Sequence, residues 1–239
     1  MERLKHKIAI VTGSSSGIGK AIALRFAREG ATVVVAARRF YKCEETVAHI
    51  EAAGGRAVAI QTDIADECQV EQLIAETVRR YQRLDILVNN AGTFGGRQIA
   101  ETSTDTFDEV MGTNVRGTFF CCRAGFTQMK KQSGGTILNM SSVAGVQAWS
   151  GTGTYSASKH AILALSKSLA DEGRAYGIKV SAICPGGVAE ELVDATVEAR
   201  AGSEKIDPFD IAETALYLAC LGPQAVVHQL VVDRRDADW

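Results

Sequence analysis

The chain has 239 residues, of which 46% are hydrophobic and 23% are charged, so it is long enough to bury a large core in one α/β domain. Its 26 Lys and Arg residues against 28 Asp and Glu residues give a net charge of -2, and no basic stretch is long enough to follow a phosphate backbone. We therefore expect no nucleic-acid partner.

The N-terminal residues pass directly from a short polar segment into a strand-like run, without an apolar signal core or a cleavage site. The chain also lacks a run of about 18 apolar residues, so we expect a soluble, cytoplasmic protein that does not bind membranes. The six cysteines show no CxxC spacing, and most lie among apolar residues. We therefore expect neither a metal site nor a disulfide.

Short β-branched runs alternate with longer amphipathic segments along the chain. The predicted strands cover residues 7–12, 32–37, 57–62, 85–90, 135–140, 179–184 and 228–233. The predicted helices cover residues 17–29, 41–53, 66–81, 104–131, 155–176 and 208–220. Continuous apolar strands that alternate with helices are typical of a parallel sheet covered on both faces. The pattern predicts one doubly wound α/β domain over residues 1–239, with ligands beyond the carboxyl ends of its strands.

A glycine-rich loop, TGSSSGIGKAIA, follows the first predicted strand at residues 12–23. Gly13 permits a tight turn, Gly17 lets backbone N–H groups approach an anion, and Gly19 lets the helix lie close to the sheet. The G-x3-G-x-G spacing differs from the commoner G-x-G-x-x-G fingerprint of dinucleotide sites. Taken alone, the loop is also consistent with a flexible turn capped by Ser.

A tyrosine and a lysine stand four residues apart in YSASK, at the start of the predicted helix 155–176. Tyr155 and Lys159 therefore share one helix face. A nearby ammonium stabilises tyrosinate, so we expect the pKa of Tyr155 to fall below its usual value of about 10, which suits a general acid and base. The alternative is an ordinary exposed pair on a helix.

The order and spacing of several motifs resemble those of the short-chain dehydrogenase/reductase family over residues 7–233. These motifs are the glycine-rich loop, NNAG at residues 89–92, Asn114, the serines of NMSSVAG, YSASK and CPGGV. The combination is specific although each motif alone is weak. The resemblance implies a single Rossmann domain of about seven strands that binds NAD or NADP. It also implies reversible hydride transfer between the nicotinamide and a carbonyl or alcohol.

The resemblance assigns roles to four candidate catalytic residues. Tyr155 would give a proton in reduction and accept one in oxidation, and Lys159 would also hold the nicotinamide ribose. Ser142, which lies thirteen residues before Tyr155, is favoured over Ser141 as the hydrogen-bond donor to the substrate oxygen. Asn114 would hold a water chain that links the lysine to solvent.

The resemblance also assigns the dinucleotide contacts. The expected cofactor-binding residues are Gly13, Ser15, Ser16, Gly17, Ile18, Gly19, Arg38, Arg39, Asp63, Ile64, Asn90, Ala91, Gly92, Tyr155, Lys159, Pro185, Gly186 and Val188. Asp63 would accept a hydrogen bond from the adenine amino group, and it is also a candidate cap for the following helix.

The residues after the second predicted strand indicate which dinucleotide is used. Enzymes that use NAD normally have Asp or Glu here, which binds the ribose hydroxyls and repels a 2′-phosphate. This chain has Ala37 followed by Arg38 and Arg39, which resembles the family's NADP-preferring members. We therefore expect NADP, with NAD as the alternative if both arginines are only solvated residues at a helix start.

Two departures from the family pattern bear on the substrate. Ala189 and Glu190 stand where the family commonly has x-Thr, whose hydroxyl meets the nicotinamide carboxamide, and we expect Glu190 to shape a substrate loop over residues 190–207. The C-terminal VVDRRDADW replaces the V-D-G-G of the fatty-acid and sugar reductases, which disfavours a 3-oxoacyl carrier-protein reductase. No particular carbonyl or alcohol substrate is favoured.

Small residues form a stripe on the predicted helix 155–176, at Ala157, Ala161, Ala164 and Ser168. Such a stripe lets another helix approach closely, either from the protein's own sheet or from a second copy. Because family members usually associate through this helix and its predecessor, we expect a homodimer or homotetramer.

Three functional classes follow from these observations. The first is an NADP(H)-dependent carbonyl reductase or alcohol dehydrogenase, with an NAD-dependent enzyme of the same family as its variant. The second is a nucleotide-sensing protein without turnover, which Glu190 favours and the complete catalytic set disfavours. The third is a nonenzymatic scaffold. The sequence disfavours it because the charge pattern shows no surface for binding a partner.

Overall fold

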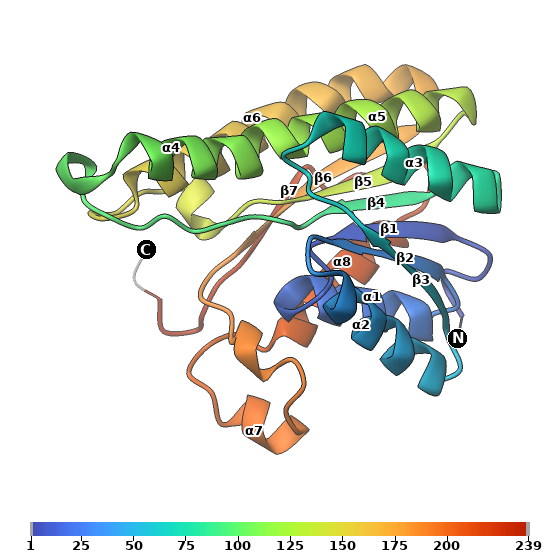
Figure 1. The fold of residues 1–239 in the computed structure, drawn as a ribbon, viewed down its shortest axis with the longest axis horizontal. Coiled ribbons are helices and arrows are strands. Elements are labelled where there is room, and N and C mark those ends of the chain that lie inside the picture. The colour runs from blue at the N-terminus through green and yellow to red at the C-terminus, as the bar shows by residue number, and fades with distance from the viewer. Residues whose placement is uncertain (1, 238–239) are drawn as a thin grey trace.

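The computed structural model describes residues 2–237 (Figure 1). The strands are β1 (Ile8–Thr12), β2 (Thr32–Ala37), β3 (Arg56–Gln61), β4 (Ile86–Asn89), β5 (Gly135–Met140), β6 (Ile178–Pro185) and β7 (Gln229–Val232). The helices are α1 (Gly17–Arg28), α2 (Phe40–Ala52), α3 (Glu67–Tyr81), α4 (Thr104–Val110), α5 (Thr118–Lys131), α6 (Gly153–Gly173), α7 (Val197–Ala201) and α8 (Pro208–Ala219). The predicted domain limits and C-terminal motif extend to Met1, Asp238 and Trp239, which lie outside the described residues.

Within the described residues, the strands form one seven-stranded parallel sheet in the order β3-β2-β1-β4-β5-β6-β7. The inner strand β1 pairs with β2 on one side and with β4 on the other, so that Ile10 lies beside Val34 and Leu87. The strand order reverses at this point, which is where doubly wound sheets bind ligands. The predicted doubly wound fold is confirmed.

Helices cover both faces of the sheet, which explains why its inner strands are mostly apolar. In Figure 1, α1, α2 and α8 lie on one face, and α3, α5 and α6 lie on the other. Phe26 and Leu216 belong to the buried core on the first face, and Leu73 and Met129 to the core on the second. All five residues of β1 are buried, as expected for a strand that packs on both sides.

The cap of α3 differs from one of the sequence-based expectations. Asp66 precedes the helix, and its carboxylate accepts hydrogen bonds from the backbone N–H groups of Cys68 and Gln69. Asp63 lies three residues earlier, and its carboxylate accepts from the N–H of Ala65 at 3.0 Å. The expectation that Asp63 caps the helix is therefore wrong, because the helix begins only at Glu67.

The predicted helix 104–131 is interrupted in its middle. A π-helical stretch, Met111–Gly117, joins α4 to α5 and contains Asn114. Such stretches place one extra residue in a helical turn and occur often at functional sites. A Cβ on Gly117 would lie 2.9 Å from Ile64, so this turn packs closely on the residues that follow β3.

The segment 190–207 is more ordered than a polar loop. It contains a 3₁₀ turn, Glu190–Leu192, and the short helix α7. The N–H of Ala189 donates to the carbonyl of Ile206 at 2.9 Å, and the N–H of Ile206 donates to Gly187 at 2.9 Å. These bonds close the base of the segment beside the end of β6.

The cysteines are free thiols, and four of them, Cys43, Cys121, Cys122 and Cys184, are buried. Burial raises the pKa of Cys122 to about 12, so this thiol stays protonated at neutral pH. Among the helices of residues 2–237, none combines the length and the apolarity needed to span a bilayer.

Candidate active site

Two loops at the carboxyl end of the sheet are tied together by a threonine. The hydroxyl of Thr12, at the end of β1, accepts hydrogen bonds from the N–H groups of Asn90 and Ala91 at 3.0 and 3.1 Å. The side chain of Asn90 donates back to the carbonyl of Thr12 at 3.0 Å. The glycine-rich loop and the loop after β4 therefore form one rigid edge at the point where the strand order reverses.

The glycine-rich loop needs its glycines for backbone angle and for space. Gly13 has φ +66°, and a Cβ on it would lie 2.8 Å from the Cα of Ala91. Gly17, the first residue of α1, has φ +53°, and a Cβ there would lie 2.6 Å from a carboxylate oxygen of Glu190. A side chain at either position would therefore collide with a neighbour, and at Gly17 that neighbour is Glu190.

A cleft of about 530 Å³ extends from the glycine-rich loop to the Tyr155–Lys159 pair. The sequence-predicted residues that line it are Gly13, Ser15, Ser16, Ile18, Arg38, Arg39, Asp63, Ile64, Asn90, Ala91, Gly92, Ser142, Tyr155, Lys159, Pro185, Gly186 and Val188. The other predicted residues, Gly17, Gly19 and Asn114, are buried behind this lining. Residues from every predicted motif therefore meet in one cleft, while their individual roles stay predictions.

The deep end of the cleft holds three of the four candidate catalytic residues. Ser142 follows β5, and its hydroxyl donates to the carbonyl of Pro185 at 3.3 Å and accepts from the N–H of Ala144 at 3.1 Å. It lies close enough to Tyr155 to influence the pKa of the phenol. The ammonium of Lys159 lies 5.6 Å from the centre of the Tyr155 ring and donates to the carbonyl of Met140 at 3.0 Å. The side chains come from α6 and from the end of β5, which together fix their separation.

Burial dominates the ionisation of this pair. It raises the pKa of Tyr155, an effect that the Ser142 contact opposes and the negative charge of Glu190 reinforces. Burial also lowers the pKa of Lys159 to about 8. The expectation that Lys159 lowers the pKa of Tyr155 is therefore wrong. The physical reason is that the ammonium bonds to Met140 and lies over the phenol ring, while the phenol itself is desolvated.

Asn114 lies just behind the cleft wall, where the π-helical stretch carries its side chain inward. Its amide accepts from the N–H of Thr93 at 2.8 Å and donates to the carbonyl of Thr93 at 2.9 Å. It also donates to the hydroxyl of Ser158 at 3.0 Å. A Cβ on Gly92 would lie 3.1 Å from the Asn114 amide oxygen and 3.5 Å from the Lys159 nitrogen, so Asn114 and Lys159 flank the same glycine.

The two arginines after β2 lie at the opposite end of the cleft and differ in their contacts. Arg39 donates to the hydroxyl of Ser16 at 3.2 Å, on the glycine-rich loop. Arg38 uses its backbone carbonyl to accept from Gln61 at 3.0 Å, and both arginine side chains are exposed. Ala37 lines the cleft beside them. This rim is cationic and contains no carboxylate at the position where NAD-dependent enzymes carry one.

These features fit a phosphate-bearing dinucleotide. The backbone at Gly13 and Gly17 forms a cradle that a Cβ would fill, and it opens at the N-terminus of α1, where unpaired N–H groups attract anions. The carboxyl group of Glu190 already lies against Gly17. Arg38 and Arg39 supply positive charge at one end of the cleft and Lys159 supplies it at the other.

Several cleft residues were missed by the sequence analysis, namely Thr62, Thr93, Phe94, Thr113 and Met140. Phe94 packs its ring edge-on against Tyr155, with centroids 4.9 Å apart. Thr93 and Phe94 could have been predicted from the sequence, because they directly follow the NNAG motif.

Comparison with known proteins relates the chain to a family of oxidoreductases. The family model described as short chain dehydrogenase matches residues 7–201. An uncharacterized oxidoreductase of Thermotoga maritima is 43% identical over 200 residues, which cover 84% of this chain and 79% of the relative. A 3beta-hydroxysteroid dehydrogenase of Mediterraneibacter gnavus is 40% identical over 195 residues, covering 81% and 70%. A 3-oxoacyl-[acyl-carrier-protein] reductase of Staphylococcus aureus is 37% identical over 226 residues, covering 89% and 90%.

Proposed function

This chain belongs to the short-chain dehydrogenase family, and we propose that it transfers a hydride between NADP(H) and a carbonyl or alcohol substrate. The observation that carries the proposal is the meeting of Ser142, Tyr155 and Lys159 at one end of a cleft whose other end is the glycine-rich loop. A dinucleotide that spans this cleft would bring its reactive end to the tyrosine.

The proposed chemistry divides between the cofactor and three side chains. When bound, the nicotinamide supplies or accepts the hydride. Tyr155 gives its proton to the carbonyl oxygen in reduction, and its raised pKa keeps the phenol protonated at neutral pH. The Ser142 hydroxyl donates to the same oxygen as negative charge develops on it. Lys159, charged below about pH 8, holds positive charge beside the phenol ring.

NADP(H) is proposed over NAD(H) because of the rim after β2. Ala37 leaves room for a 2′-phosphate and carries no charge to repel it. Arg38 and Arg39 provide guanidinium groups of the kind that bind phosphate with charge-assisted hydrogen bonds. Arg39 already donates a hydrogen bond to Ser16, so this cation joins the rim to the glycine-rich loop.

The relatives suggest which substrates to test first. Two of the relatives are a 3beta-hydroxysteroid dehydrogenase and a 3-oxoacyl-[acyl-carrier-protein] reductase. We propose that residues 190–207 form the segment that covers the substrate, since this segment begins at the cleft with Glu190. Phe94, next to Tyr155 and 65% exposed, provides an apolar surface at the same end.

A substrate panel tests the proposal. Steroid ketones, 3-oxoacyl thioesters, simple ketones, aldehydes and sugars are each assayed for oxidation of NADPH and of NADH. We expect at least one panel member to be reduced, with a higher kcat/KM for NADPH. Binding of NADPH without turnover of any panel member in either direction would favour the nucleotide-sensing protein instead, which the position of Glu190 in the cleft makes the second candidate.

A further inference from the structure

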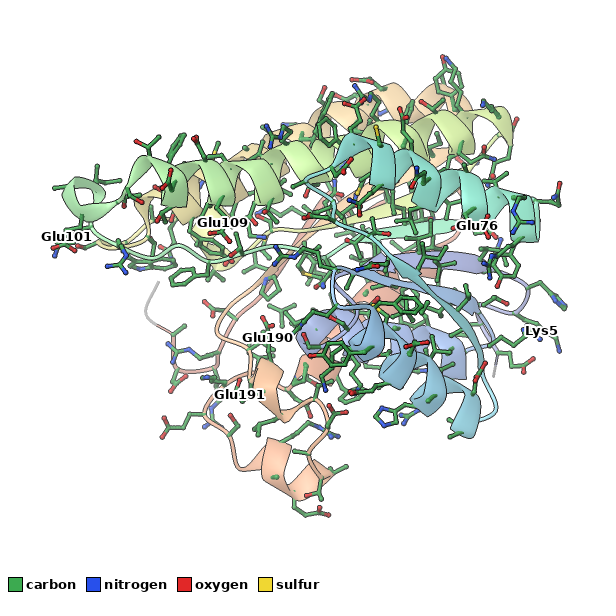
Figure 2. All side chains as sticks on the ribbon, in the orientation of Figure 1. Lys5, Glu76, Glu101, Glu109, Glu190 and Glu191 are labelled. Carbon is green, nitrogen blue, oxygen red and sulfur yellow. The ribbon has the colours of Figure 1, made fainter. Side chains whose placement is uncertain are left out.

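Glu190 lies where an anion is expected on the glycine-rich loop. Its carboxylate is placed directly over Gly17, close enough that a Cβ on Gly17 would come within 2.6 Å of the oxygen Oε2. Figure 2 shows Glu190 on the segment that follows β6, beside the start of α1. α1 has 12 residues, its N-cap Ser16 makes no side-chain cap hydrogen bond, and its first turn contains no acidic residue. The carboxylate that faces this helix start therefore comes from a distant segment of the chain.

The same carboxylate also acts on the catalytic end of the cleft. Its negative charge favours the protonated forms of Tyr155 and Lys159, both on α6, so it adds to the effect of burial on the pKa of Tyr155 and opposes the effect of burial on the pKa of Lys159. Burial raises the pKa of Glu190, as does the negative charge of Glu191, whereas the positive charges of Lys159 and Lys205 lower it. Glu191 and Lys205 are joined by an ion pair at 3.1 Å. Glu190 thus lies between the glycine-rich loop and the tyrosine–lysine pair, on the path that a bound dinucleotide would take.

Further contacts hold the segment of Glu190 against α1. Asp194 forms an ion pair at 2.6 Å with Lys20, whose side chain is only 4% exposed. Val188 pairs with Ile206 across the base of the segment. These contacts anchor the chain on both sides of Glu190. The packing of the segment therefore holds Glu190 over Gly17.

We propose that Glu190 is an intramolecular competitor for the pyrophosphate of the dinucleotide. The proposal rests on the proposed function, because it takes the glycine-rich loop to be the pyrophosphate site. Two anions cannot share this small cradle without strong repulsion, so the carboxylate must leave Gly17 before the phosphates bind. The free protein then binds cofactor with an affinity that is reduced by the fraction of molecules in which Glu190 covers the loop.

This competition would link the cofactor site to the substrate segment. Residues 190–207 begin at Glu190, so displacement of its side chain also moves the start of the segment that we propose to cover the substrate. Threonine, the residue that the family commonly has here, has a neutral side chain that does not repel phosphate. The acidic residue therefore distinguishes this chain within the family pattern.

The test compares binding by three variants with that of the wild type, measured by calorimetry at fixed ionic strength. Glu190→Gln keeps the size of the side chain and removes its charge, and Glu190→Thr installs the common family residue. Glu204→Gln is the matched control, because Glu204 is exposed on the same segment. The probes are NADPH, inorganic pyrophosphate, and adenosine 2′-phosphate, which lacks the pyrophosphate.

We expect both Glu190 variants to bind NADPH and pyrophosphate about tenfold more tightly than the wild type. Their affinity for adenosine 2′-phosphate should stay within about twofold, as should every affinity of Glu204→Gln. Unchanged pyrophosphate binding in both Glu190 variants would overturn the proposal. Weaker NADPH and pyrophosphate binding would also overturn it, because Glu190 would then help to hold the cofactor.

The pyrophosphate measurement separates this proposal from the proposed function. If neither the wild type nor any variant binds NADPH, the proposed NADP(H)-dependent function fails. Tighter pyrophosphate binding in Glu190→Gln would still support competition at the glycine-rich loop in that case, and unchanged pyrophosphate binding would still reject it.

Discussion

Burial affects the pKa values of Tyr155 and Lys159 more than any direct charge contact between the two side chains does. Burial keeps the phenol protonated by raising its pKa, and it brings the pKa of the ammonium down to about 8. At neutral pH the pair is therefore a neutral phenol beside a cation, which is the form required to donate a proton in reduction.

The lowered pKa of Lys159 predicts a pH dependence. Below about pH 8 the ammonium is charged, and above it the charge is lost, so kcat/KM for reduction should fall as pH rises through about 8. The profile is measured with NADPH and the best panel substrate, and the Kd of NADPH is measured at each pH. A profile that stays level well above pH 8 would show that the charge of Lys159 is not needed.

The rim after β2 predicts how cofactor preference can be changed. A charge-assisted contact with the 2′-phosphate contributes about 1.5 to 3 kcal/mol, so the wild type should prefer NADPH by roughly 10- to 150-fold. The double variant Ala37→Asp/Arg38→Gln should prefer NADH, because a carboxylate binds the free 2′-hydroxyl and repels phosphate.

The readout for the cofactor prediction is the ratio of kcat/KM for the two cofactors at fixed ionic strength. Arg28→Gln, an exposed arginine in the last turn of α1, is the control for loss of one positive charge. A wild type that favours NADH, or a ratio that the double variant leaves unchanged, would mean that the two arginines do not select the cofactor.

At the residue scale, the sequence located the cleft well because its motifs depend on local geometry. The family resemblance assigned the loop glycines, and it assigned Ser142 by its place thirteen residues before Tyr155. The direction of the Tyr155 pKa could not be assigned, because it depends on how deeply the phenol is buried. The position of Glu190 over Gly17 was equally hidden, since it requires a contact between residues 173 positions apart in the chain.

At the scale of elements, strands and most helices could be predicted because apolar runs and amphipathic periodicity are local signals. The π-helical stretch Met111–Gly117 could not, because its key contact is tertiary. Asn114 pairs with the backbone of Thr93, which lies 21 residues earlier, and the helix accommodates one extra residue per turn around that contact. The helical pattern of residues 104–131 carries no sign of it.

The hydrogen bonds of Asn114 predict a cost in stability. Asn114→Ala removes the partner of both backbone groups of Thr93 and of Ser158, so it should destabilise the fold by about 1 to 3 kcal/mol. Urea unfolding gives the free energy difference. Thr127→Ala, at an exposed position of α5 that bonds only to its own helix, should stay within about 0.5 kcal/mol. Equal costs for the two variants would contradict the proposed role of Asn114 in holding this turn.

At the scale of the whole molecule, the sheet order places the site. The reversal between β1 and β4 brings the glycine-rich loop beside the NNAG loop, and β5 and α6 add the catalytic residues next to them. The sequence could predict this arrangement because parallel crossovers are right-handed and connections are short. It could not predict how residues 190–207 fold back onto α1, since the ion pair between Lys20 and Asp194 joins distant parts of the chain.

The small-residue stripe on α6 predicts association. Ala157, Ala164 and Ser168 are exposed, so the stripe does not pack on the protein's own sheet as the alternative interpretation required. We propose that it lets α6 meet the same helix of a second copy in a homodimer or homotetramer. Light scattering at micromolar concentration should give a multiple of the 25.5 kDa chain mass.

A bulky substitution on the stripe checks the face used for association. Ala164→Trp should shift the molecule toward the monomer, whereas Val226→Trp, exposed near β7, should not if α6 forms the main contact. A wild type that scatters as a 25.5 kDa particle would contradict association altogether.

The role of Tyr155 as proton donor is tested most directly by the rate of NADPH oxidation in the Tyr155→Phe variant. Only the transferable proton is lost, and the ring still packs against Phe94. With the best panel substrate we expect the rate to fall by about 10²- to 10⁴-fold, while the Kd of NADPH changes by no more than about twofold. Tyr217→Phe, a tyrosine 49% exposed on α8, should retain the wild-type rate. A Tyr155→Phe variant that keeps most of its rate would show that another group donates the proton.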